Sequence, residues 1–272
     1  MRYSASSLSF PQGAIKGLKN LDKRIGIEIF YEFASDEMWN HVLEEAMEGR
    51  EGEFSIHSPF FYANIGYTKE SELFRELCVP FDLYHKFHAQ FYVLHSQGEG
   101  CPPSDGAERT ELRKRVTERM QRFAGLCEKE GVTLVIENLF RGTPGPLFNQ
   151  EQYLRLFEEI PNAYALIDVG HAVLGHYDVY QVQETLKDRL IGYHIHDNDG
   201  VHDSHWRIQA EQGVVDWKKF CLGVKRFTPK AALVMEYAHA KPEDYVQDME
   251  TLEGIFKEID DEYAKPVGEP DL

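Results

Sequence analysis

Cysteine is scarce in this 272-residue sequence, and its four cysteines stand far apart with no CxxC pair. This spacing argues against a disulfide framework and favours free thiols in a reducing compartment. No run of 18 apolar residues occurs, so we expect no transmembrane helix. The first residues, MRYSASSLSFPQG, lack the apolar core of a secretory signal. These absences together predict a cytoplasmic protein.

Positive charge is also in short supply, since 29 Lys and Arg face 46 Asp and Glu for a formal net charge of −17. Such a balance argues against nonspecific binding to nucleic acid or to an anionic membrane. The hydrophobic share of 42% is enough to build one large core. Histidine is unusually frequent, with 12 residues, and several of the histidines stand at the ends of predicted strands.

Short apolar segments alternate with longer amphipathic segments along the chain. We expect strands over residues 3–10, 25–30, 53–57, 90–95, 132–137, 164–168, 190–196 and 231–236. Helices are expected over residues 35–48, 106–130, 149–160, 215–227 and 243–263. Eight β-then-α units in about 260 residues predict parallel strands closed into a single (β/α)₈ TIM barrel. A doubly wound open sheet is the alternative, but PQGAIKG is a poor glycine-rich turn after the first strand.

Ionisable residues stand at the C-terminal ends of most of the predicted strands. In a TIM barrel, the catalytic groups lie at these ends. The ionisable residues are His57, His95, Glu137, Asp168, His194 and Glu236. Because side chains alternate along a strand, the three carboxylates continue the mainly apolar rows that face the barrel interior. Buried carboxylates at this density would repel one another at a cost of several kcal/mol each, which a divalent cation removes. Mixed carboxylate and imidazole ligands suit Mn²⁺, Zn²⁺, Fe²⁺ or Co²⁺, whereas oxygen ligands alone suit Mg²⁺.

The segments IENL, LIDVGH, HIHDNDG, DSHW, GVVDW and VMEY resemble, in order and spacing, the xylose isomerase-like TIM barrels. That superfamily includes sugar phosphate isomerases and epimerases, inosose isomerases and dehydratases, and endonuclease IV-like enzymes. The resemblance implies one barrel domain over residues 1–264, followed by a loosely held tail over residues 265–272. It also implies a principal divalent metal, with manganese or zinc favoured and cobalt, iron or magnesium as alternatives. The implied ligands are Glu137, Asp168, His194 and Glu236.

The favoured function is a metal-dependent isomerase or epimerase of a sugar, sugar phosphate or cyclitol, with a small-molecule carbohydrate as its substrate. The resemblance implies that Glu137 and Glu236 stand on either side of the substrate as proton acceptor and donor. Proton abstraction next to a carbonyl then gives an enediolate. A dehydratase or other lyase using the same enediolate is an alternative. The segment HWRIQAEQGVVDW replaces the short glycine-rich loop of many relatives, which indicates a substrate head group unlike that of ketose 3-epimerases.

Two further alternatives come from other functional classes. An endonuclease IV-type phosphodiesterase acting on abasic DNA holds three zinc ions, and its additional ligands match His57, His95, His171, Asp203 and His205. Sugar-processing relatives retain these residues too, so they either bind substrate or hold additional metal, and we expect about one ion per chain. The acidic surface, with only Arg141 and Arg207 as cations close to the motifs, argues against DNA. A metal-binding barrel subunit without catalysis of its own is the third class.

Several other residues near these motifs have more than one possible role. Glu28 resembles a position that orients a metal-binding histidine, and His171 one that contacts substrate. His196 either faces the site or is structural. Phe60 and Trp206 are candidates for the apolar wall of a sugar site or for the core. The oligomeric state, a homo-oligomer included, is left open.

Overall fold

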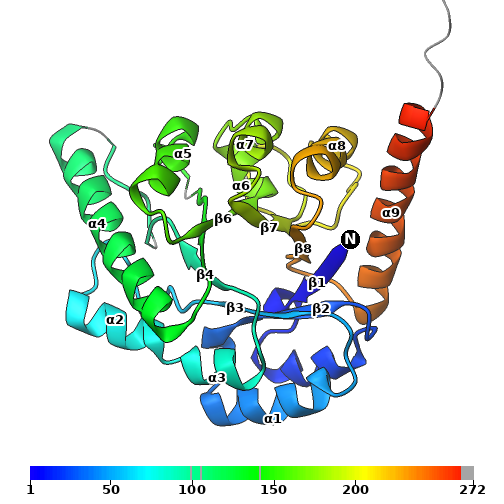
Figure 1. Cartoon of the computed structure of the whole chain (residues 1–272), viewed down its shortest axis with the longest axis horizontal. Helices are drawn as coiled ribbons and strands as arrows, with labels where there is room; N and C mark the ends of the chain where they lie inside the picture. The colour runs from blue at the N-terminus through cyan, green and yellow to red at the C-terminus, as the bar shows by residue number, and fades with distance from the viewer. Residues whose placement is uncertain (99, 105, 141, 265–272) are drawn as a thin grey trace, which may run out of the picture.

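Eight parallel strands close into a barrel in chain order, with β8 hydrogen-bonded back to β1 (Figure 1). The computed structural model describes residues 1–272 apart from 99, 105, 141 and 265–272. The strands are β1 (Arg2–Ser6), β2 (Gly26–Phe30), β3 (Phe54–His57), β4 (Tyr92–His95), β5 (Leu134–Glu137), β6 (Tyr164–Asp168), β7 (Leu190–Ile195) and β8 (Ala232–Met235). The predicted TIM barrel is therefore confirmed, and the open-sheet alternative is wrong. The predicted tail over residues 265–272 lies outside the described residues.

Only the first strand departs clearly from its predicted range, because it ends at Ser6 instead of residue 10. The Ser6 hydroxyl accepts a hydrogen bond from the backbone N–H of Leu8 and so caps a 3₁₀ turn over Ser7–Ser9. A side-chain hydrogen bond of this kind competes with the strand ladder.

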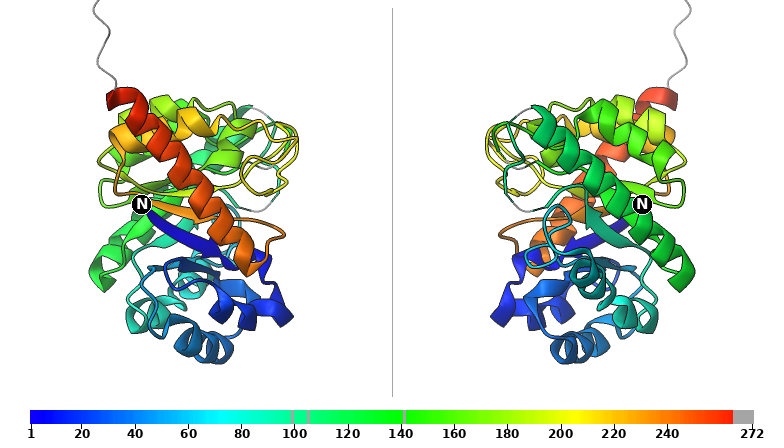
Figure 2. Two further views of the ribbon diagram at one scale, coloured as in Figure 1. Left: turned by 90° about the vertical axis from the view of Figure 1, so that its right-hand side faces the viewer. Right: turned by 90° about the vertical axis from the view of Figure 1, so that its left-hand side faces the viewer.

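Helices surround the barrel, and the two longest, α4 and α9, lie on opposite sides of it (Figures 1 and 2). The α-helices are α1 (Asp36–Met47), α2 (Glu70–Cys78), α3 (Phe81–Lys86), α4 (Gly106–Glu130), α5 (Gln150–Glu159), α6 (Val169–Leu174), α7 (Val179–Leu186), α8 (Trp217–Phe227) and α9 (Pro242–Ala264). All five predicted helices form, whereas the short helices α2, α3, α6 and α7 were not predicted. None of the described helices is both long enough and apolar enough to cross a membrane.

Apolar side chains pack in two places, between the strands and the helices and inside the barrel. The inner cluster comprises Phe91, Val93, Val135, Leu166, Ala232 and Val234. Its members confirm the inward-facing rows predicted from strand alternation. Glu137, Asp168 and Glu236 each lie two residues beyond an inner-cluster residue, so they face the same axis at the barrel mouth.

Candidate metal and active site

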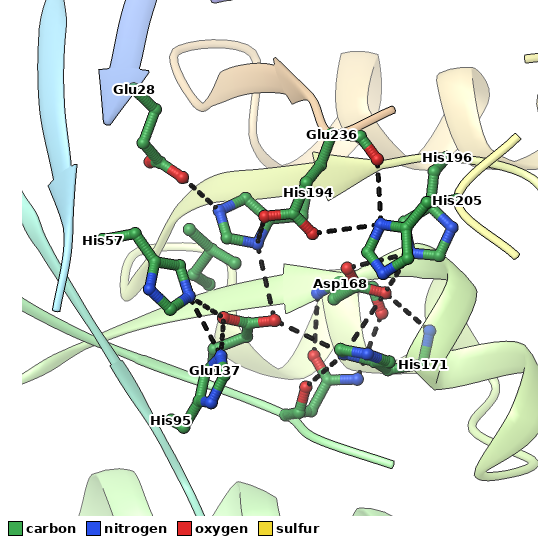
Figure 3. Close-up of polar contacts among 12 residues, drawn as sticks. Glu28, His57, His95, Glu137, Asp168, His171, His194, His196, His205 and Glu236 are labelled. Atoms are coloured by element: carbon green, nitrogen blue, oxygen red, sulfur yellow. Dashed lines mark hydrogen bonds and ion pairs between the residues drawn. The ribbon is translucent and has the colours of Figure 1, made fainter. Parts of the chain in front are cut away.

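The barrel mouth gathers a dense set of carboxylates and imidazoles from successive strands (Figure 3). The strand residues and their neighbours are Glu28 from β2, His57 from β3, His95 from β4, Glu137 from β5, Asp168 from β6, His194 and His196 from β7 and its end, and Glu236 after β8. All of these side chains are buried. Helix α6 adds His171, and the loop after β7 adds Asp203 and His205. The structure thus brings together every site residue named from the sequence.

His194 lies at the centre, between the two predicted proton-transfer carboxylates. Its Nδ1 is 3.4 Å from Glu137 Oε1 and 3.4 Å from Glu236 Oε1. Its Nε2 donates to Glu28 Oε1 at 2.8 Å, and Ser55 Oγ donates to the other Glu28 oxygen at 2.8 Å. Glu28 therefore orients this imidazole, as the resemblance implied. In the neutral form of His194 with its proton on Nε2, shared with Glu28, the Nδ1 lone pair faces the site and is available to a cation.

Asp168 is held rigidly at the point where β6 becomes α6. Its Oδ1 accepts from the backbone N–H of His171 at 2.6 Å, as the N-cap of the helix. Its backbone N–H and C=O bond to the Asn138 side chain at 2.8 and 3.1 Å. His171 Nδ1 lies 3.3 Å from Glu137 Oε1 and 3.5 Å from Asp168 Oδ1, so these two carboxylates share one neighbourhood. The four ligands implied by the resemblance are therefore adjacent.

Two further groups flank this centre, each with three ligand atoms within 4.8 Å of one another. In the first group, His57 Nε2 and His95 Nε2 are 2.9 Å apart, and each lies 3.5 Å from Glu137 Oε2. In the second, Asp203 lies 3.1 Å from His171 Nε2 and 3.3 Å from His205 Nε2. The additional residues named from the sequence therefore form two ligand-type groups, not a scattered set.

Several buried polar atoms at the centre have no hydrogen-bond partner among the described residues. They are Glu137 Oε2, His194 Nδ1 and Glu236 Oε1. Leaving such an atom unpaired costs about 1–3 kcal/mol, so native proteins rarely do it without compensation. His194 Nδ1 and Glu236 Oε1 lie 3.4 Å apart, and all three atoms belong to the donor types that bind divalent transition metals. The residues present therefore fit a metal ion.

The electrostatics show how strongly these groups act on one another. Burial lowers the pKa of the His194 imidazole, but Glu236, Glu28 and Glu137 together raise it well above its ordinary value. Burial raises the pKa of Glu137, and the positive charges of His194 and His95 outweigh it and lower that pKa well below the usual range. For Glu236, burial prevails and raises the pKa. A cation bound here would take the place of the protons that the imidazoles otherwise attract.

A cavity of about 260 Å³ opens onto these groups, and its walls are of two kinds. One side consists of the carboxylates and imidazoles, and the other is largely aromatic. The Phe30 ring stacks on His57 with 4.2 Å between centroids, and Phe60 lies 4.6 Å from the His95 ring. Phe61 packs 4.3 Å from Phe60 and is 61% exposed, at the edge of the cavity. Of the two alternatives left open for Phe60, the structure shows its side chain on the wall of this cavity.

Other wall residues were not predicted, since no chemical signature marks them in the sequence. These are Leu8, Phe30, Phe61 and Ala238. Trp206, the other candidate for an apolar wall or for the core, does not line this cavity and instead lines a neighbouring surface cleft. Asp197 holds it there by antiparallel backbone pairing.

Arg207, one of the two cations named from the sequence, does not line the cavity. The Arg207 guanidinium bonds to Asp244 and Asp248 of α9 at 2.6–3.0 Å. Arg141 lies outside the described residues. Among the described residues that line the cavity, there is no lysine or arginine.

Comparison with known proteins gives one family match and many similar folds. A family model described as xylose isomerase-like TIM barrel matches residues 25–255. The uncharacterized protein y4fM of Sinorhizobium fredii (strain NBRC 101917 / NGR234) is 32% identical over 97 residues, which span 34% of this chain and 29% of that relative.

Two solved structures match over nearly the whole chain. A D-tagatose 3-epimerase-like protein is 18% identical with a TM-score of 0.82, over 97% of this chain and 100% of its own. A D-psicose 3-epimerase with D-tagatose, from Clostridium cellulolyticum H10, is 11% identical with a TM-score of 0.72, over 95% of this chain and 99% of its own. At these identities the likeness shows a shared fold.

Proposed function

The chain belongs to the xylose isomerase-like TIM barrel family, and on that basis we propose that it is a metal-dependent isomerase or epimerase of a carbohydrate. The observation that carries this proposal is the pair Glu137 and Glu236, which both line the cavity and each place a carboxylate oxygen 3.4 Å from His194 Nδ1. The two similar structures are named as an epimerase-like protein and an epimerase, which supports the proposal.

Glu137, Asp168, His194 and Glu236 would hold the metal ion. A divalent ion bound there supplies Lewis acidity, which polarises a carbonyl and an adjacent hydroxyl and so acidifies the neighbouring C–H. Glu28 keeps the His194 ring oriented, and Asn138 holds the Asp168 backbone. These contacts fix the ligands before substrate arrives, which lowers the cost of reorganisation.

Proton transfer falls to the two glutamates. Both line the cavity beside His194, so a substrate bound over the centre would lie within reach of both carboxylates. Glu137 would accept the proton from carbon, and Glu236 would return one to the neighbouring carbon or to the opposite face. The aromatic side of the cavity packs against the C–H face of a sugar and keeps water from the deprotonated carbon.

The direct test is solvent exchange, in which the enzyme incubated in deuterium oxide labels a carbon-bound hydrogen of its substrate. We expect exchange with at least one ketose or inosose, even where net turnover is slow. Loss of water alongside exchange would move the assignment to a dehydratase. Efficient metal-dependent cleavage of abasic DNA, with no exchange in any sugar or cyclitol, would contradict the proposal.

The wall of the cavity favours substrates without a phosphate group. A phosphate is normally met by arginine or lysine, and none lines the described cavity. Each charged hydrogen bond that the phosphate cannot make lowers the binding free energy by about 1.5–3 kcal/mol, which is roughly a ten- to hundredfold loss of substrate affinity. We therefore expect neutral ketoses or inososes to show higher kcat/KM for exchange than their phosphate esters. Methyl ethers at the esterified position control for size, and a preference for the phosphates would refute this assignment.

A metal-cluster phosphodiesterase is the second candidate, and the two flanking groups of ligand atoms are the observation that favours it. Elemental analysis separates the two functions. On the carbohydrate proposal we expect about one ion per chain, unchanged in His57→Ala and in the exposed control His85→Ala. The phosphodiesterase would be supported instead by two or three metal ions per chain, a number that falls by one in His57→Ala, together with cleavage of abasic DNA.

A further inference from the structure

His196 is fully buried and contacts the proposed ligand Asp168 and the neighbouring His205 ring, although the resemblance gives it no metal-binding role. Its Nε2 lies 3.1 Å from Asp168 Oδ1 and 3.1 Å from Asp168 Oδ2. Because an ionised carboxylate only accepts hydrogen bonds, the His196 Nε2–H is the donor. Its equal distance from both oxygens restrains rotation of the carboxylate about its Cβ–Cγ bond.

The same ring also supports the outer group of ligand atoms. It stacks on the His205 ring with 3.9 Å between centroids and 18° between planes. His205 is further tied to β8, since its Nδ1 donates to the backbone carbonyl of Glu236 at 2.9 Å. One buried imidazole therefore connects the Asp168 carboxylate to His205.

Gly170 provides the space that this ring occupies. A Cβ built at residue 170 would lie 2.0 Å from His196 Cε1 and 2.5 Å from Nε2, far inside contact distance. Any side chain at this position would push the ring away from Asp168. The glycine in the DVGH segment is thus explained by packing against His196, because the neighbouring turn must approach the ring closely.

We propose that His196 is a positioning residue, which holds the Asp168 carboxylate in its metal-binding orientation and packs against the His205 ring beside it. This inference rests on the proposed metal at Glu137, Asp168, His194 and Glu236. Donors behind metal-binding carboxylates typically contribute 10–100-fold in metal affinity. On this inference His196 acts through Asp168 and contributes no bond to the ion itself. A ligand role for its ring, together with His205 and Glu236, is the alternative that the test separates.

The test measures metal binding and not turnover. His196→Phe keeps an aromatic ring against His205 but removes the donor to Asp168, and His196→Gln restores an amide donor. Zn²⁺ affinity is measured by competition with a chromophoric chelator, and the visible spectrum of the Co²⁺-loaded protein reports the ligand field. We expect His196→Phe to bind roughly 10–100-fold more weakly than wild type, at unchanged stoichiometry and with a shifted Co²⁺ spectrum. His196→Gln should recover part of that loss.

Gly170→Ala tests the same inference without replacing an ionisable residue. The new Cβ displaces the His196 ring, so the Zn²⁺ affinity and Co²⁺ spectrum should follow those of His196→Phe. Gly125→Ala in α4 is the matched control, because a Cβ there meets no atom within 4 Å. Metal-free circular dichroism checks that each variant folds.

Three results would overturn the inference. One is wild-type affinity and an unchanged Co²⁺ spectrum in folded His196→Phe. Another is the loss of one whole ion from that variant, because His196 would then be a ligand. The third is a wild-type protein that binds no divalent metal, which would remove the proposed function as well and is recognised before any variant is made.

Discussion

Replacing Glu137 or Glu236 with glutamine is expected to lower solvent deuterium exchange into substrate by about 10²–10⁴-fold, the scale of general-base catalysis. Glutamine keeps the shape of each side chain but cannot accept a proton from carbon. Both side chains are buried on the cavity wall, so the change leaves the aromatic side intact. Exchange is followed by NMR or mass spectrometry, and substrate affinity is measured separately at equilibrium.

Glu211→Gln is the control for this experiment, because Glu211 lies on the exposed loop after β7 and lines the separate cleft. It removes the same charge without entering the cavity. We expect its exchange rate to match that of the wild type. Wild-type exchange in both Glu137→Gln and Glu236→Gln would refute their assignment as the proton-transfer pair.

Removal of the divalent ion by chelation is expected to abolish exchange and to lower the melting temperature. An ion present at 100 times its Kd stabilises the folded chain by about 2.7 kcal/mol. With about 2–4 °C per kcal/mol for a domain of this size, the loss on chelation is on the order of 5–10 °C. Calorimetry with and without chelator measures the shift, and added metal should restore both stability and exchange.

Asp168→Ala and His194→Ala should reproduce the effect of chelation by weakening the ligand set. Each removes one donor from the centre and leaves the flanking groups in place. Metal content after dialysis is the readout, with His85→Ala as a histidine change on the exposed surface. Full occupancy together with full activity in both variants would contradict the ligand assignment.

The fold could be predicted from the sequence because two periodicities act together over the whole chain. Strand alternation placed Val135 and Leu166 inside the barrel, and hence Glu137 and Asp168 at its mouth. The short helices α2, α3, α6 and α7 were missed, since six to nine residues hold too few turns for a helical pattern to emerge. The end of β1 at Ser6 depended on a single capping hydroxyl.

The site was predictable in composition but not in arrangement. Ligand-type residues at the ends of several strands are a strong collective signal, because parallel strands deliver their ends to one place. The aromatic wall of Phe30 and Phe61 carries no such signal, as large aromatics are equally common in cores. The contact between His196 and Asp168 depends on rotamers and on the space left by Gly170, which exist only in three dimensions.

Three of the four proposed ligands lie on barrel strands, whereas the outer part of the aromatic wall lies on a loop. Glu137, Asp168 and His194 lie on barrel strands. The residues two positions before Glu137 and Asp168 on their strands belong to the apolar interior of the barrel. Phe60 and Phe61, by contrast, lie on the loop after β3, outside the barrel hydrogen bonds. Evolution can therefore exchange one part without disturbing the other. Insertions and substitutions in the mouth loops alter which molecule is accepted, while the reaction chemistry is inherited unchanged with the strands.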